Sequence, residues 1–565
     1  MKKNLKSILV LILVLAFVLS ACTTPGQQTT AAPATTAGPT ETQAPPAEPK
    51  VLRGRLAAEP ASLDTQAGQD VNASQVRSLI YDPIIRNHNF EFIPGGAETW
   101  EVSADGLVYT FHMRKDAKWS DGQPLTAHDY VYGAIRLIDP TPPAPNGSMA
   151  FYGFVLKNGE AFNKGEVTDP TMVGVKALDD YTVEYTLEKP YPYFLDYVSS
   201  NLFNPNRKDF TEKYGVEFAT STDKLIGNGP FVLVEWKPED RFIFEKNENY
   251  WNKDAIKLDR IELYVIGDGN TAILMFQNGE LDYADIPKDL IPAMDGLGRA
   301  IYTTSGTTMW MEFNLDSTSP AAKFLANANF RKAIGHAIDR ELFIKAALND
   351  GSIPALSYVP KAMVTNGELW GEKFNNEFYP KTADLVKAEE YLAKALEELG
   401  VARADIPTIK YLTDDRPDRR LMGEIIQDML FTNLGLNLDI TLVQSRQRWD
   451  MMTAGDYDIV FAGIASSNPD PIGYLTRLTS ENGLNDTRYA SAEYDALIAA
   501  SDSEVDPEKR AELLYEALVR LMDEGPLVPV YNAGGAWAKR DDLINIFKGG
   551  IRSPDPDFIF ADFAE

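Results

Sequence analysis

Two kinds of hydrophobic periodicity alternate along most of this chain. Apolar residues fall at every second position over 107–113, 183–187 and 261–265, which predicts half-buried β-strands. They recur at helical spacing over 385–399 and 514–522, and a glycine closely follows each of these two stretches. Strands and helices interleaved in this way predict a fold of the α/β class.

The length of the chain sets the number of folded bodies. Its 565 residues exceed the roughly 250–300 that a single core accommodates, so we expect two or three lobes. A third helix is predicted over Phe330 to Leu348, with Ile334, Ile338 and Leu342 on one face. The hydrophobic fraction of 44% and the charged fraction of 24% are ordinary for globular proteins, which excludes global disorder and a polytopic membrane protein.

The inventory for catalysis is thin. The four histidines lie far apart, and the sequence contains no HExxH, GxSxG or GK[ST] phosphate-loop motif. Gly227-Asn228-Gly229-Pro230 superficially resembles a nucleotide loop, but it lacks a third glycine and Pro230 removes a backbone donor, so we interpret it as a structural turn. The sequence does not exclude a pair of carboxylates suited to glycoside hydrolysis, because the chain has 82 acids, but no motif supports such a pair. We predict no enzymatic activity, no metal and no cofactor.

Charge and cysteine content restrict the partners further. The formal net charge is −28 and no basic stripe offsets it, so we expect no nucleic-acid partner. The single cysteine excludes an internal disulfide and a thiolate metal cluster.

The N-terminus predicts export. Three lysines fall within the first six residues, and Ile8 to Leu19 is an unbroken apolar run, shorter than the ~20 residues of a membrane-spanning helix. The run ends in Leu19-Ser20-Ala21-Cys22, which resembles the bacterial lipoprotein cleavage box. The resemblance implies a signal peptide over 1–21 and lipidation of Cys22. The alternative is a plain secretory signal with a chance cysteine.

Residues 22–49 predict a linker. The stretch is rich in Thr, Pro and Ala and contains no aromatic residue, so it buries too little apolar surface to order itself. Its reach lies between about 30 Å as a flexible coil and about 80 Å as extended polyproline. We expect the folded part to start near Val51.

Motifs of the folded part carry a family resemblance. Gly95–Pro140, GGAETWEVSADGLVYTFHMRKDAKWSDGQPLTAHDYVYGAIRLIDP, resembles the extracytoplasmic oligopeptide- and dipeptide-binding proteins of ABC importers, the bacterial family 5 solute-binding proteins. Further blocks match in the same order: EPASLDTQ (59–66), VKALDDYTVEYTLEKPYPYF (175–194), GNGPFVLVEWKPEDRFIFEKNENYW (227–251), FQNGELDYADIP (276–287), NFRKAIGHAIDRELF (329–343) and EGPLVPVYN (524–532).

The resemblance implies an architecture. It is an α/β, periplasmic-binding-protein-like fold of type II, with two lobes, a hinge and an extra domain. The implied segments are 50–80, 206–305 and 531–565 for lobe I, 81–205 for the extra domain and 306–530 for lobe II. The chain would then cross between the lobes near residues 305 and 530.

The resemblance also implies a function. The protein would be a monomeric, lipid-anchored receptor on the extracytoplasmic face of the cell membrane. It would capture peptides, above all oligopeptides, between its lobes and deliver them to ABC permease subunits. The same role for an oligosaccharide or another uncharged solute is an alternative, as is a metal chelate, against which the few histidines argue. A secreted hydrolase and a surface signalling or chaperone-like protein are further alternatives.

The family holds the ligand main chain against extended segments, and its side chains enter hydrated pockets. These segments align with 307–314, 460–467 and 69–71. The residues implied to bind ligand are Gln69, Val71, Asn146, Met309, Trp310, Met311, Ser445, Phe461, Gly463, Ile464, Ala465, Ser467 and Asp470. From the residues alone, the methionines and the tryptophan at 309–311 fit core packing as well. The period of a strand places Trp310 opposite its two methionine neighbours.

Several positions depart from the family pattern. Peptide-binding members carry an Asp for the ligand ammonium where this chain has Ser467, and some carry an Arg for the ligand carboxylate where it has Phe461. Aromatic pocket walls align with the smaller Ile464 and Ser445, and a tyrosine contact aligns with Asn146.

Four explanations are open for the missing ammonium anchor. Asp470 substitutes for it, or the peptide is held mid-chain with its ends free, or the ligand is not a peptide, or the alignment is shifted locally by a few residues. An uncompensated buried ammonium would cost several kcal/mol, on the order of the penalty for burying any unpaired charge.

Overall fold

The computed structural model describes residues 48–564 except 61, 67–69, 89–90, 142–143, 145–148, 366, 466–468 and 549–555. The predicted signal peptide, Cys22 and nearly all of the linker therefore lie outside the described residues. The contacts divide the chain after Glu48, and the first strand begins at Val51. No helix in the described part of the chain has the length and apolar character needed to cross a membrane.

A four-stranded sheet opens the fold. Its order is β1-β10-β9-β8, in which β1 (Val51–Leu56) and β10 (Arg260–Val265) are parallel and the other pairs are antiparallel. The remaining strands are β9 (Arg241–Lys246) and β8 (Phe231–Lys237). Alternate residues of β1 are fully buried, as the two-residue period of a half-buried strand requires. The predicted strand at 261–265 is confirmed.

A second four-stranded sheet is antiparallel throughout, in the order β4-β5-β7-β6. Its strands are β4 (Ala97–Val102), β5 (Val108–Met113), β7 (Thr182–Thr186) and β6 (Val175–Asp179). The alternation predicted at 107–113 and 183–187 is confirmed by β5 and β7. These two sheets share one apolar core, because residues of both belong to a single cluster of buried side chains.

The third sheet is the largest, with the path β11-β19-β12-β18-β16-β17 and β13 added to β19. Its strands are β11 (Tyr283–Ile286), β19 (Leu527–Lys539), β12 (Ile301–Phe313), β18 (Ile459–Ala465), β16 (Ile409–Asp414), β17 (Leu438–Val443) and β13 (Ile353–Pro354). β17, β16 and β18 are mutually parallel, and β12 is antiparallel to β18. A second large core lies around β12, β18 and β16, and a small third core lies between α6, α7 and β11.

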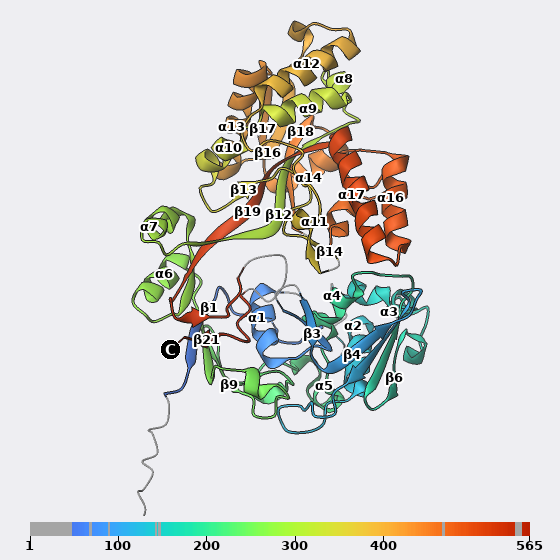
Figure 1. The fold of residues 1–565 in the computed structure, drawn as a ribbon, viewed down its shortest axis with the longest axis vertical. Coiled ribbons are helices and arrows are strands. Elements are labelled where there is room, and N and C mark those ends of the chain that lie inside the picture. The colour runs from blue at the N-terminus through green and yellow to red at the C-terminus, as the bar shows by residue number, and fades with distance from the viewer. Residues whose placement is uncertain are drawn as a thin grey trace, which may run out of the picture. The chain divides into compact units, whose positions relative to one another are not determined.

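Two strands of 13 residues each connect the second and third of these cores. β12 and β19 pair side by side, as Figure 1 shows, and the pairing shifts register between Thr304 and Thr308. Ser305 Oγ donates to the carbonyl of Ala533 at 3.1 Å in this irregular stretch. A Cβ on Gly534 would lie 2.1 Å from the carbonyl oxygen of Gly351, so only glycine permits this backbone contact. The predicted crossing points near 305 and 530 both fall within these strands.

The long predicted helices are present. α12 (Leu385–Leu399) and α17 (Pro507–Glu524) end at Gly400 and Gly525, which have φ of 63° and 60°. The other helices are α1 (Val71–Ile80), α2 (Ala127–Ile138), α3 (Gly159–Asn163), α4 (Phe194–Val198), α5 (Lys208–Tyr214), α6 (Gly269–Gln277), α7 (Ile291–Gly296), α8 (Ala322–Leu325), α9 (Ala328–Ala337), α10 (Arg340–Ala347), α11 (Trp370–Lys373), α13 (Pro417–Leu434), α14 (Ser445–Ala454), α15 (Ile472–Leu475) and α16 (Ala492–Ser503).

The prediction of one helix over 330–348 is wrong. Ile338 has extended backbone angles, so α9 ends before it and α10 begins after Asp339. The Asp339 carboxylate accepts a hydrogen bond from the backbone N–H of Leu342 at 2.8 Å and caps the new helix. Leu342 is 54% exposed, so it does not share a buried face with Ile334. The apolar spacing continues across the break, which hid the cap in the sequence.

The segment at 227–230 is a loop that bends at Gly229-Pro230 and leads into β8. The side chain of Asn228 binds both backbone groups of Asp82, accepting at 3.1 Å and donating at 2.8 Å. A Cβ on Gly227 would lie 2.0 Å from the carbonyl oxygen of Ile80, so the glycine permits a close approach of two backbones. These backbone contacts support a structural role for the segment, as predicted. Four short strands, β2 (Ile85–His88), β3 (Glu91–Pro94), β14 (Val364–Thr365) and β15 (Glu368–Leu369), form two small hairpins, and β20 (Leu543–Ile544) pairs with β21 (Asp562–Phe563).

Candidate ligand-binding site

The two long segments predicted to hold the ligand form one pair of strands. β12 and β18 are antiparallel, with Met309 opposite Gly463, Trp310 opposite Ala462 and Met311 opposite Phe461. Segments far apart in the sequence are therefore neighbours at the centre of the large sheet.

The far edge of β18 is open along part of its length. β16 pairs with β18 only at two positions, Tyr411 with Ile459 and Leu412 with Val460. Among the described residues, 461–465 have β12 on one side and no strand on the other. A strand with unpaired backbone donors and acceptors on one edge can accept an extended chain by strand addition.

The methionines and tryptophan of β12 are core residues. Trp310 and Met311 are fully buried, and the Trp310 ring meets the Tyr358 ring edge-on with centroids 5.1 Å apart. The Trp310 indole donates to the Glu312 carboxylate at 3.1 Å. Residues on both faces of β12 are buried at this point, so the two-residue period exposes neither set of side chains.

The side chains along the free part of β18 become more exposed toward its end. Phe461 is buried, Gly463 is exposed and Ile464 is half-buried. A Cβ on Gly463 would lie 2.1 Å from the Met309 sulfur, so the glycine leaves the space that this methionine occupies. The Phe461 ring lies between aromatic neighbours, 6.1 Å from Phe343 and 6.2 Å from Tyr531 between centroids.

The other predicted residues are dispersed. Val71 is the first residue of α1 and is 75% exposed, and Ser445 is the exposed first residue of α14. Gln69, Asn146, Ser467 and the side chain of Ala465 lie outside the described residues.

Asp470 already has a strong partner. Arg510 donates to its two carboxylate oxygens at 2.7 and 2.9 Å, and the backbone N–H of Ile472 donates at 2.9 Å. Burial works against the charge of Arg510, but the attraction of Asp470 leaves the pKa of Arg510 above its ordinary value. For Asp470 to bind a ligand ammonium, it would have to share or leave this buried ion pair.

Sequence reasoning missed three polar or aromatic features near these strands. Arg419 on α13 lies with its guanidinium carbon 5.7 Å from the centroid of the Phe461 ring. Trp449, one turn along α14 from Ser445, is 49% exposed and lies 4.7 Å from the guanidinium of Arg448. The signal for Arg419 was the run DDRPDRR at 414–420, a dense cluster of three acids and three arginines directly after an apolar strand.

The third missed feature is a buried acid on β12. Glu312 is 1% exposed, and burial raises its pKa to about 7. The charge of Arg477 lowers this pKa and that of Asp486 raises it, while Trp310 and Tyr457 stabilise the carboxylate by hydrogen bonds. The group lies in the core and not on the free part of β18, since Glu312 pairs with Val460.

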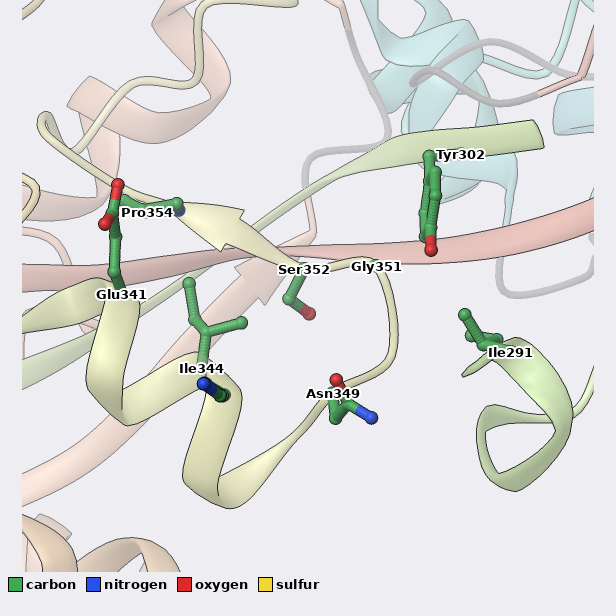
Figure 2. A pocket seen from close by; sticks show the side chains of 9 residues that line it. Ile291, Tyr302, Glu341, Ile344, Asn349, Gly351, Ser352 and Pro354 are labelled. Atoms are coloured by element: carbon green, nitrogen blue, oxygen red, sulfur yellow. The ribbon is translucent and has the colours of Figure 1, made fainter. Parts of the chain in front are cut away.

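A separate cavity lies beside the long strands. Figure 2 shows its lining from α7, β12, α10 and the loop before β13, with Tyr302 and Ile291 on one side and Ile344 and Asn349 on the other. Its volume is about 250 Å³. This is below the ~300–1,000 Å³ of common small-molecule sites, and none of the predicted ligand residues lines it.

The described residues offer no group of three or more His, Cys, Asp or Glu side chains that could hold a metal. The arrangement can offer backbone hydrogen bonds, an apolar floor and a nearby cation, which are features of binding.

Comparison with known proteins agrees with this reading. The family described as bacterial extracellular solute-binding proteins, family 5, matches residues 91–486. The oligopeptide-binding protein OppA of Bacillus subtilis is 32% identical over 556 residues, which cover 96% of this chain and 97% of the relative. The substrate-binding domain of an oligopeptide ABC transporter from Bacillus anthracis is 30% identical, with a TM-score of 0.63 over 92% of this chain and all of that one.

The fold is also that of the periplasmic murein tripeptide-binding protein MppA in its unliganded open form, with a TM-score of 0.80 over 92% of this chain and 98% of that one, at 24% identity. The predicted fold class, α/β and periplasmic-binding-protein-like with two lobes, is confirmed by these likenesses. The relatives are solute-binding proteins and not enzymes. The chain belongs to the bacterial extracellular solute-binding proteins of family 5.

Proposed function

We propose that this protein is the substrate-binding component of an ABC importer and that it captures peptides, oligopeptides above all. The free edge at 461–465 is the observation that carries the proposal. All peptides share a backbone with regularly spaced donors and acceptors, and an open strand edge can bind that backbone whatever the side chains. The names of the B. subtilis relative and of the B. anthracis domain, both oligopeptide proteins, support this choice of ligand.

We propose the remaining contacts from the family resemblance. The ligand lies between lobe I (50–80, 206–305 and 531–565) and lobe II (306–530), with the extra domain at 81–205. Gln69, Val71, Asn146 and Ser467 also contribute to the site. Trp449 is the aromatic residue best placed to take over the pocket wall that Ser445 lacks, because the two share one helix and Trp449 is half-exposed.

The same proposal covers the location and partners. Lipidation of Cys22 tethers a monomer to the extracytoplasmic face of the cell membrane, and residues 22–49 let the body reach permease subunits. Gel electrophoresis of cells fed with labelled palmitate tests the anchor. A Cys22→Ser variant should lose the label and be released into the medium.

Peptides methylated on their backbone nitrogens test the strand-edge site. Native mass spectrometry of the purified protein first identifies a bound peptide, and calorimetry then measures its affinity. Methylating nitrogens at alternate positions removes donors to the strand edge, because alternate residues of an edge strand point their N–H groups to the same side. We expect one alternating set to weaken binding about 5- to 12-fold per lost bond, given the ~1–1.5 kcal/mol of such bonds.

The matched control is the other alternating set, which should bind nearly as well as the parent peptide. Equal losses from both sets would contradict pairing with a strand edge. A protein that no peptide stabilises against heat would contradict peptide transport altogether.

One observation favours a second candidate. Asp470 is bound by Arg510, so the acid closest in sequence to Ser467 is committed elsewhere. An oligosaccharide or another uncharged solute needs no carboxylate to balance an ammonium group. Stabilisation of the protein by neutral oligosaccharides, with none by peptides, would establish this alternative.

A further inference from the structure

The positively charged side chain of Arg419 lies at the start of the free part of β18, residues 461–465. α13 begins at Pro417, and the side chain of Arg419 on its first turn reaches over the ring of Phe461, 5.7 Å from its centroid. Phe461 is the first residue of β18 beyond the two positions that pair with β16. An extended chain bound along 461–465 would therefore have one end beside this guanidinium.

The hydrogen bonds of Arg419 leave donors to spare. Among the described residues, its Nη1 donates to the sulfur of Met422 at 3.8 Å, and the Arg419 side chain also makes a hydrogen bond to the Tyr531 hydroxyl. Its Nε is buried and makes no hydrogen bond to any residue that the structure describes. The Asp418 carboxylate forms a long ion pair with that nitrogen, at 3.9 Å.

Two buried arginines in the described chain show how a guanidinium pairs with an acid of the chain itself. Arg136 donates to both oxygens of Asp64 at 2.7 and 2.6 Å, and Arg510 does the same with Asp470 at 2.7 and 2.9 Å. Each makes the two-pronged contact that a carboxylate and a guanidinium prefer. Arg419 has the same chemistry but no acid at that distance, so its position suits a carboxylate that comes from outside the chain.

The two ends of the free strand differ in charge. Beyond residue 465, the acid Asp470 is neutralised by Arg510. At residue 461, Arg419 has only a long contact of 3.9 Å with Asp418 among the described acids, and Arg448 is paired with Asp414 at 3.1 Å. A bound peptide would meet its better counter-charge at the Phe461 end, which favours placing its C-terminal carboxylate there.

We infer that Arg419 is the residue that binds the terminal carboxylate of a peptide lying on the free edge of β18, in place of an arginine on the strand itself. This inference rests on the proposed peptide-binding function. The contact with the Phe461 ring and the hydrogen bond to Tyr531 hold the guanidinium beside the strand. The site then selects peptides that have a free C-terminal carboxylate and does not discriminate between their side chains.

Peptides with an acid or an amide at the C-terminus test this directly. Calorimetry compares both forms of one bound peptide on the natural protein, Arg419→Gln and Arg419→Lys. We expect the natural protein to prefer the acid by about 10- to 100-fold, as charge-assisted hydrogen bonds allow. The Gln variant should lose this preference and the Lys variant should retain only part of it, because Lys keeps the charge without the planar fork.

Arg420→Gln is the matched control, since it removes one positive charge from the next, exposed position of the same helix. It should keep the full preference for the acid. An acid-to-amide ratio near one on the natural protein, or an unchanged ratio in the Gln variant, would overturn the role of Arg419 while leaving peptide binding intact. Absence of binding by either form would instead contradict the proposed function. If the Gln variant does not fold, the natural protein and the Lys variant still decide the question.

Discussion

The two halves of β18 have different surroundings although they belong to one strand. Ile459 and Val460 are fully buried between β12 and β16, whereas 461–465 have a strand on one side only. β16 leaves β18 after Leu412, stays paired with β17 at Thr413 and Asp414, and ends there. Pro417 then starts α13, and proline is favoured in a first helical turn and ill-suited to a central strand, so β16 does not continue beside the rest of β18.

The difference shows how one element can serve both stability and binding. The paired half is part of the core, and changes there should affect the free energy of unfolding. The free half keeps one packed face and one open edge, so changes there should affect binding more than folding. Three substitutions test this division, each at a different place along or beside the strand.

The largest effect is expected beyond the free half, at the ion pair of Asp470 with Arg510. The two side chains are 9% and 4% exposed, so Asp470→Asn leaves a buried, uncompensated charge on Arg510. Removing one partner of a buried pair costs about 3–5 kcal/mol, which we expect as a loss in the free energy of unfolding. Urea denaturation at neutral pH measures it.

Glu512→Gln is the control, because it removes an exposed acid from the same helix as Arg510. It should change the free energy of unfolding by less than about 0.5 kcal/mol. A comparably small loss in Asp470→Asn would mean that Asp470 is free to act as the substitute ammonium anchor. That result would revive the first explanation for the missing Asp at position 467.

The second effect belongs to the paired half, where Glu312 lies opposite Val460. Burial raises the pKa of Glu312 from 4.5 to about 7, so the unfolded chain loses this proton at lower pH than the folded protein. Stability from this group is complete below pH 4.5 and is lost as the pH rises to about 7. At about 1.4 kcal/mol for each pH unit, the loss is roughly 3 kcal/mol.

Glu312→Gln should remove this dependence while retaining the shape of the side chain. The free energy of unfolding of the variant, minus that of the natural protein, should rise between pH 4.5 and 7 and then level off. Asp486, whose pKa burial also raises, titrates in both proteins and largely cancels in the difference. A difference that is flat over this range would show that Glu312 is ionised in the core, held by Arg477.

The sequence predicted the regular elements better than the contacts. The strands at 107–113 and 183–187 and the helices at 385–399 and 514–522 were found because burial on one face imposes a strong period. The helix break at Asp339 was missed, because apolar spacing continued through it and a capping aspartate has no period. The pair of strands at 307–314 and 460–467 followed only from family resemblance, since pairing between distant segments leaves no local pattern.

The candidate site was predictable only in part for the same reason. Trp310 and Met311 belong to the aligned segment but lie in the core, because the central strand is covered on both faces. Arg419 belongs to a different element from Phe461, and only the fold brings them together. A charged run after a strand was visible in the sequence. Which of its arginines faces the strand depends on how α13 is oriented, and the sequence does not show this.

The smallest effect on stability is expected within the free half, at Gly463→Ala. The added Cβ would lie 2.1 Å from the sulfur and 2.8 Å from the terminal carbon of Met309, so this flexible side chain must move. Crowding of this kind costs about 1–3 kcal/mol, and a methionine that can adopt other rotamers places the expected loss near the lower limit. Urea denaturation of Gly463→Ala, Met309→Ala and the double variant measures the coupling between the two positions. We expect the double variant to lose less than the sum of the single variants, because shortening Met309 frees the space that the new Cβ needs.

Strict additivity would mean that the packed face of the free half tolerates a larger residue. The glycine would then have to be explained by the open edge alone, through a close approach of the ligand backbone, and Gly463→Ala should weaken peptide binding without destabilising the fold.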